Sequence, residues 1–133
     1  MIVADASAIL AIVLGEADAA LFEDALAASP GAVMSPVNYW EVLVRSRGEF
    51  GQAGVDYAQA LMDRAEIVVV PADSEMACAA AEAFARYNGR AGGRLNMGDC
   101  FAYALAAREG DGLLYKGNDF TRTDVKTALA REG

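Results

Sequence analysis

The stretch Met1-Ile2-Val3-Ala4-Asp5-Ala6-Ser7-Ala8 decides how the chain begins to fold. Its first four residues are apolar and predict a short buried strand that ends at Asp5. Ser7 is the predicted N-cap of the apolar helical stretch that follows, from Ala8 to Leu14. These residues therefore predict a strand, a turn and a helix, with a carboxylate where the strand ends.

The same alternation continues along the chain. Further short apolar strands are predicted at 32–34, 67–70 and 113–115, and helices at 16–28, 36–50, 55–64, 74–87 and 97–109. The tail from Thr123 is predicted to be helical, with at most a short fifth strand nearby. Alternating strands and helices indicate an α/β fold, with a mostly parallel four- to five-stranded sheet flanked by helices on both faces.

Histidine is absent from the 133 residues, and 19 Asp and Glu residues outnumber 11 Lys and Arg residues, which gives a net charge of −8. Without imidazole there is no Ser-His-Asp or Cys-His pair, no HExxH zinc site and no histidine-based ribonuclease. What remains is carboxylate chemistry, assisted by a metal. The acidic balance also disfavours bulk electrostatic binding of nucleic acid, so such a substrate would require bound cations or a basic partner.

Length and composition predict a single domain over residues 1–133. Cys78 and Cys100 lie in alanine-rich surroundings without CxxC spacing, so we expect two buried thiols in a reduced, cytoplasmic protein. No early apolar run approaches the roughly 20 residues of a spanning helix, and no basic leader precedes the first one. We therefore expect neither a membrane segment nor an export signal.

Carboxylates are predicted at the edge of the sheet where parallel strands end, which is where such folds bind ligands. Asp5 ends the first strand and Asp119 follows the fourth, while Asp99 and Glu41 lie early in two helices. Four acids at one edge would repel one another unless a divalent cation neutralised them. Oxygen ligands suit Mg²⁺ or Mn²⁺, which can activate water for phosphodiester hydrolysis.

Each of these acids also has a purely structural interpretation. Asp5 could cap the next helix, and Asp99 could complement the dipole of its own helix. Glu41 could pair with Arg45 one helical turn away, and Asp119 could be a turn residue. Only the combination of all four favours a site.

Four segments carry a further indication: Ile2-Val3-Ala4-Asp5-Ala6-Ser7-Ala8, Tyr39-Trp40-Glu41-Val42-Leu43, Leu95-Asn96-Met97-Gly98-Asp99-Cys100-Phe101-Ala102-Tyr103-Ala104-Leu105-Ala106 and Leu113-Leu114-Tyr115-Lys116-Gly117-Asn118-Asp119-Phe120. In this order and at these separations they resemble the four motifs of the PIN-domain ribonucleases, most closely the VapC toxins of bacterial toxin–antitoxin pairs. The similarity covers almost the whole chain. It implies a PIN-like three-layer sandwich formed by a single PIN domain.

The resemblance also implies roles. Asp5, Glu41, Asp99 and Asp119 match the acidic quartet that binds one or two Mg²⁺ or Mn²⁺ ions, with Asp5 and Asp99 as direct metal ligands, and Ser7 matches a supporting hydroxyl residue. The implied activity is an endoribonuclease toxin that leaves 5′-phosphate and 3′-hydroxyl ends. The implied partners are an RNA substrate, a second copy of the chain and a VapB-like antitoxin with a DNA-binding N-terminal part.

Basic side chains cluster just before Asp99, at Arg86, Arg90 and Arg94. They are interpreted either as a solvated surface or as contacts for the RNA backbone beside the metal. Asp124 lies in a segment similar to the family's downstream pattern and is interpreted as structural.

Apolar residues suggest both core and interface. The helical stripe of Tyr39, Trp40, Leu43 and Val44 is predicted to be core. Leu10, Val13, Leu14 and Phe50 are candidate contacts for a partner protein.

Three other interpretations compete with the nuclease. A receiver-type signalling domain would use Lys116, but it needs a pair of acids after the first strand and an Asp after the third, where this chain has Asp5 alone and Val68-Val69-Val70-Pro71. An Asp-nucleophile phosphohydrolase needs a second acid two residues after Asp5, where Ser7 stands. The third is a binding module without activity.

Overall fold

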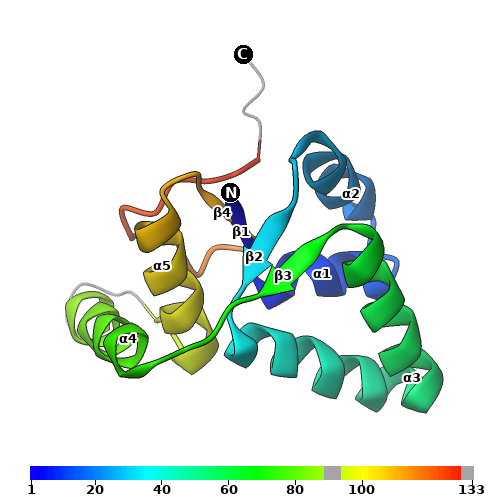
Figure 1. Cartoon of the computed structure of the whole chain (residues 1–133), viewed down its shortest axis with the longest axis horizontal. Coiled ribbons are helices and arrows are strands. Elements are labelled where there is room, and N and C mark those ends of the chain that lie inside the picture. Colours follow the sequence, from blue (N-terminus) through cyan, green and yellow to red (C-terminus); the bar gives the residue numbers. More distant parts are fainter. Residues whose placement is uncertain (89–93, 130–133) are drawn as a thin grey trace.

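A computed structural model describes residues 1–88 and 94–129, and a parallel sheet lies at its centre (Figure 1). Within the described ranges the sheet has four strands: β1 (Ile2–Ala4), β2 (Ala32–Met34), β3 (Ile67–Val69) and β4 (Leu113–Leu114). Their order is β3-β2-β1-β4, and all three neighbouring pairs are parallel. The predicted parallel sheet is confirmed, with β1 at its interior.

Helices cover both faces of this sheet. They are α1 (Ala6–Val13), α2 (Ala19–Ala28), α3 (Pro36–Arg64), α4 (Ser74–Tyr87) and α5 (Met97–Glu109). In Figure 1 the sheet separates α1, α2 and α3 from α4 and α5. The three-layer α/β arrangement follows, as predicted. None of the described helices is both long and apolar enough to cross a membrane.

Alternating strand residues supply the two halves of the core. Val3, Val33 and Leu113 belong to the cluster formed with α4 and α5. Ala4 and Leu114, the next residues along their strands, belong to the cluster formed with α1, α2 and α3. Because the sheet is buried on both faces, β1, β2 and β4 consist entirely of apolar residues.

The long helix α3 is two helices joined at Gly51, as the separate predictions at 36–50 and 55–64 indicate. Gly51 has φ 65° and ψ −152°, a conformation open to glycine and strained for other residues. Gly54 then packs against the first half, where an added Cβ would lie 2.4 Å from the carbonyl oxygen of Ser46. The two halves therefore fold closely on each other.

The predicted helix in the tail is wrong for the described residues. Thr127 forms an isolated parallel bridge with Leu113. Leu113 donates its amide to the carbonyl of Lys126 at 2.8 Å, and Ala128 donates to the carbonyl of Leu113 at 2.9 Å. Pairing with the free edge of β4 satisfies these backbone groups, so the tail runs extended, with one bridge where a short fifth strand was expected.

Burial differs from the prediction at the surface of the sheet and of α4. Val68 and Val69 were expected in a buried strand, but β3 is an edge strand and their side chains are 53% and 37% exposed. Cys78 was expected to be buried and is exposed, whereas Cys100 is buried as predicted.

The apolar stripe of α3 is only partly core. Tyr39 and Leu43 pack against the core, but Trp40 and Val44 are exposed. The helix rests on α1 with one face, and these two residues lie outside that contact.

The four residues predicted as candidate partner contacts differ in burial. Leu10 and Val13 are buried in the chain's own core, which makes them unavailable to a partner, and Leu14 is partly buried against it. Phe50 is exposed.

Gly112 lies where the backbone of the tail packs against the start of β4, and we expect that a larger residue here would destabilise the fold. Its φ is 106°, and an added Cβ would lie 3.2 Å from backbone atoms of Lys126, Thr127 and Ala128. Gly110 also has a positive φ, 85°, but open space around it. We expect Gly112→Ala to lower the free energy of unfolding by about 1–3 kcal/mol more than Gly110→Ala, measured by urea denaturation. Equal losses would show that the tail does not pack here.

Candidate functional site

Asp5 is fixed at the carboxyl end of β1. Its amide donates to the carbonyl of Leu114 at 2.9 Å, which continues the pairing of β1 with β4. Its carboxylate is buried and caps α1, because Oδ2 accepts hydrogen bonds from the Ser7 amide at 3.1 Å and the Ser7 hydroxyl at 2.5 Å. The prediction that Ser7 caps this helix is therefore wrong, and the capping role foreseen for Asp5 is confirmed.

Ser7 connects the ends of two strands. Its hydroxyl donates to Asp5 and accepts the amide of Lys116 at 3.0 Å, from the segment that follows β4. The Lys116 side chain points to other partners, since Nζ lies 2.5 Å from Glu16 Oε2 and 3.0 Å from Asp18 Oδ1. Lys116 is thus engaged in ion pairs, which does not favour the role that a receiver domain would give it.

Asp99 is placed by the start of α5. It forms a capping box with Asn96. The backbone amide of Asn96 donates to Asp99 Oδ2 at 3.1 Å, and the backbone amide of Asp99 donates to Asn96 Oδ1 at 2.8 Å. Burial is the main cause that raises the pKa of Asp99 to about 7. The Asn96 hydrogen bond lowers this pKa, and the negative charges of Asp5, Asp119 and Glu41 raise it.

Glu41 reaches from α3 to the same turn of α5. An added Cβ on Gly98 would lie 1.9 Å from Glu41 Oε1, so any side chain at this position would displace the carboxylate. Burial and then the charge of Asp5 raise the pKa of Glu41, while Asn38 and Arg45 lower it. Glu41 thus lies among the acids, although Arg45 still exerts the favourable charge interaction expected one turn away.

Asp119 lies on the exposed loop after β4. The loop is anchored by the buried Phe120, whose ring centroid is 4.9 Å from that of Tyr115. Asp119 is close enough for its charge to raise the pKa of Asp5, after the larger effect of burial, and that of Asp99. The four predicted acids are therefore brought together, three of them partly or fully buried and Asp119 exposed.

Asn38 was missed by the sequence reasoning. It is completely buried and its amide nitrogen lies between Asp5, Glu41 and the carbonyl of Gly98. An asparagine three residues after a serine N-cap and three before a glutamate carries no distinctive pattern, so only the contact between α3 and α5 identifies it.

The donor set fits a hard divalent cation by its chemistry. All four side chains are carboxylates, and burial together with the charges of neighbouring acids raises the pKa values of Asp5, Glu41 and Asp99, which is the electrostatic situation that a cation relieves. Within residues 1–88 and 94–129, however, no three Asp, Glu or Cys side chains already stand close enough together to hold a metal ion. The quartet is gathered without being closed around a metal position.

The three arginines of the predicted basic cluster have different surroundings. Arg86 is exposed, lies 3.7 Å from Asp124 Oδ2 and stacks at 5.0 Å over the Tyr87 ring. Arg94 is exposed, and Arg90 lies outside the described residues. Arg86 is therefore engaged in the protein's own contacts.

Asp124 is tied to two tyrosines. Its Oδ1 accepts the hydroxyl of Tyr103 and, at 3.0 Å, that of Tyr87, and these bonds lower the pKa of Asp124. Tyr87 and Tyr103 belong to α4 and α5, so Asp124 fastens the tail to both helices. This geometry fits the structural interpretation of Asp124.

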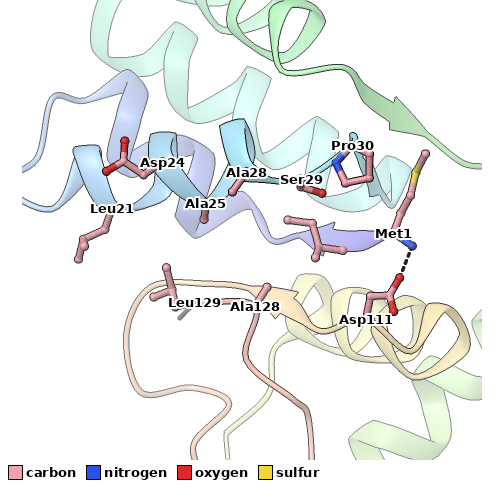
Figure 2. A pocket seen from close by; sticks show the side chains of 11 residues that line it. Met1, Leu21, Asp24, Ala25, Ala28, Ser29, Pro30, Asp111, Ala128 and Leu129 are labelled. Atoms are coloured by element: carbon pink, nitrogen blue, oxygen red, sulfur yellow. Dashed lines mark hydrogen bonds and ion pairs between the residues drawn. The ribbon is translucent and has the colours of Figure 1, made fainter. Parts of the chain in front are cut away.

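A cavity of about 630 Å³ lies at the other end of the sheet. Met1, Pro30 and Asp111, which precede three of the strands, contribute to its lining, together with Leu129 of the tail (Figure 2). The amino group of Met1 bonds Asp111 at 2.5 Å across its rim (Figure 2). None of the four acids lines this cavity, so it is separate from the candidate site.

Comparisons with known proteins agree with this geometry. The family model described as PIN domain matches residues 2–126. The Ribonuclease VapC of Mycolicibacterium smegmatis is 42% identical over 124 residues, which cover 92% of this chain and 96% of that protein. Ribonuclease VapC42 of Mycobacterium tuberculosis is 41% identical, with 95% and 98% covered. The chain therefore belongs to the PIN domain family and, within it, to the VapC ribonucleases.

Two solved structures share the fold. A crystal structure of the M. tuberculosis toxin VapC20, described as cleaving the sarcin–ricin loop, superposes with a TM-score of 0.78 at 17% identity and covers 94% of this chain and 96% of its own. A toxin–antitoxin complex from Klebsiella pneumoniae gives a TM-score of 0.71 at 15% identity, with 93% of each chain covered. The predicted PIN-like architecture is thereby confirmed.

The raised pKa of Asp99 gives the metal-free protein a pH-dependent stability. The folded protein holds this proton more tightly than the unfolded chain, so the contribution is complete below the ordinary pKa near 3.8 and is lost as the pH rises through about 7. We expect Asp99→Asn to be more stable than the parent at pH 8 by roughly 1–2 kcal/mol, after allowance for solvent screening, and equally stable near pH 4. Thermal unfolding in EDTA measures this, with the exposed Asp63→Asn as control. A parent at least as stable as Asp99→Asn at pH 8 would contradict it.

Proposed function

We propose that the chain, as a single PIN domain over residues 1–133, is the toxin of a toxin–antitoxin pair and a Mg²⁺- or Mn²⁺-dependent endoribonuclease. The observation that carries the proposal is the quartet of mutually repelling carboxylates at the carboxyl edge of the sheet. The names of the two relatives from Mycolicibacterium smegmatis and Mycobacterium tuberculosis, both VapC ribonucleases at about 40% identity, support RNA as the substrate.

Asp5 and Asp99 would hold the cation, with Glu41 and Asp119 completing the acidic edge. When bound, the cation supplies charge neutralisation for the phosphodiester and lowers the pKa of the attacking water. Ser7 keeps one oxygen of Asp5 engaged, and the Asn96 amide does the same for Asp99, so each side chain presents its other oxygen in a fixed orientation. Attack of water on phosphorus with departure of the 3′ oxygen leaves 5′-phosphate and 3′-hydroxyl ends.

The RNA would approach an acidic protein through its few exposed cations. Arg94 is exposed and lies five residues before Asp99, which makes it the described arginine best suited to a phosphate contact. Arg90 remains a proposed contact, and Arg86 would have to leave Asp124 to contribute.

The protein partners follow from charge and from exposed apolar side chains. A net charge of −8 favours an antitoxin with a basic arm that reaches the acidic edge, because complementary fields speed association. The exposed side chains of Trp40 and Val44, one turn apart on α3, offer an apolar surface for a second copy of the chain, and Phe50 offers one for the antitoxin. We place this pair in the cytoplasm, where RNA is available.

Removal of a proposed metal ligand should abolish cleavage. We expect Asp5→Asn and Asp99→Asn to lower the rate of RNA cleavage by at least about 100-fold in Mg²⁺ or Mn²⁺, because each loses a charge that the cation needs. EDTA should abolish the parent's activity, and Asp63→Asn, away from the site, should retain it. The products, mapped at their ends, should carry 5′-phosphates. Undiminished cleavage by both variants, or cleavage in EDTA, would refute the metal mechanism.

Toxicity and its relief are tested in a bacterial host. We expect induction of the parent chain to arrest growth and Asp5→Asn not to, because arrest depends on RNA cleavage. Co-expression of the gene adjacent to that of this chain, which we expect to encode the antitoxin, should restore growth, and the two proteins should copurify. Arrest that persists with Asp5→Asn would separate toxicity from the carboxylate site.

A further inference from the structure

Asn38 occupies the centre of the contact between the three elements that carry buried or half-buried acids. It lies in the first turn of α3, after the N-cap Ser35, and none of its surface is exposed. A completely buried amide must have its hydrogen bonds satisfied inside the protein. The hydrogen-bond partners of Asn38 therefore show which groups this side chain holds together.

The amide nitrogen faces acceptors from three elements. Nδ2 donates to the carbonyl of Gly98 on α5 at 3.0 Å and to Glu41 Oε1 on α3 at 3.1 Å. A longer contact of 3.4 Å reaches Asp5 Oδ1 at the end of β1. One neutral donor group thus joins two carboxylates of the quartet to the turn that carries a third, Asp99.

The orientation of this amide is fixed by Ser35. The Ser35 hydroxyl donates to Asn38 Oδ1 at 2.7 Å and accepts the Asn38 backbone amide at 3.2 Å. Turning the amide over would place its oxygen against two carboxylates and a carbonyl, all of which are acceptors. The N–H groups are therefore directed at the Gly98 carbonyl and at the two acids.

Gly98 closes the other side of the same contact. The Glu41 carboxylate occupies the space that a Cβ on residue 98 would need, at 1.9 Å from Oε1. Glu41 is thus held between the Asn38 donor and a bare stretch of the α5 backbone. Both features act on the position of one carboxylate.

We propose that Asn38 is a positioning residue that holds the Glu41 and Asp5 carboxylates beside Asp99 in the metal-free protein, so that the cation meets acids already gathered. The proposal rests on the proposed metal-dependent function. The N–H group that Glu41 accepts, with its longer contact to Asp5, offsets part of the repulsion between these acids without adding a charge that would compete with a cation. A lysine or arginine here would neutralise the site permanently.

The variant that tests this is Asn38→Ala, with Ser46→Ala as the matched control. Ser46 is a buried polar residue of the same helix, and its hydroxyl makes no hydrogen bond in the described part of the chain. We expect Asn38→Ala to weaken Mn²⁺ binding by roughly 10-fold or more, measured by electron paramagnetic resonance without RNA. Ser46→Ala should bind Mn²⁺ as the parent does.

Steady-state kinetics distinguish a loss of carboxylate positioning from a general loss of folded structure. At fixed, subsaturating Mn²⁺, Asn38→Ala should lower kcat with little change in KM for RNA, and raised Mn²⁺ should restore part of the loss. Gly98→Ala should act in the same way, because its methyl group displaces the flexible end of Glu41 at little expense to folding. The two substitutions together should be less harmful than the product of their separate effects, since both act through Glu41.

The outcomes are distinct. Mn²⁺ binding by Asn38→Ala within two-fold of the parent, even with a lowered melting temperature, would overturn the proposal and leave the nuclease intact. Fully multiplicative effects of Asn38→Ala and Gly98→Ala would show that Asn38 does not act through Glu41 and would also overturn it. A parent that binds no Mn²⁺ and cleaves RNA in EDTA would refute the metal-dependent function itself.

Discussion

Burial of the Asp5 carboxylate at the end of an interior strand is the constraint on which the rest of the structure depends. β1 has neighbours on both sides, so its end lies between the ends of β2 and β4 and beside the starts of α1 and α3. A charge in this position requires donors, and the chain supplies them from Ser7 and Asn38. Each donor ties another element to the same point.

These ties explain why the acids converge although they come from distant parts of the sequence. Ser7 links β1 to the segment after β4, which carries Asp119. Asn38 links β1 and α3 to the first turn of α5, where the capping box fixes Asp99. The residues that build the local structure are thus the residues that orient the site. Repulsion between the gathered acids destabilises this arrangement, and a bound cation would offset that repulsion.

The sequence predicted most elements where local pattern and burial agree. The helices at 74–87 and 97–109 have the predicted bounds, because the first is rich in alanine and the second begins after the N-cap Asn96. Prediction failed where a tertiary neighbour decides. The tail pairs with β4 instead of forming a helix, β3 is an edge strand with exposed valines, and Trp40 lies outside the packed face of α3. Periodicity reports an apolar face but does not say what will cover it.

By itself, the sequence determined the α/β class, the order of strands and helices, and the four acids, because strand ends and helix starts mark where charged side chains stand in a parallel sheet. Only the tertiary structure decided that Asn38 joins three of the acid-bearing elements, that Gly98 makes room for Glu41, and that Asp124 fastens the tail. Those roles depend on contacts between residues as many as 60 positions apart, and no local pattern encodes the distance between two helices.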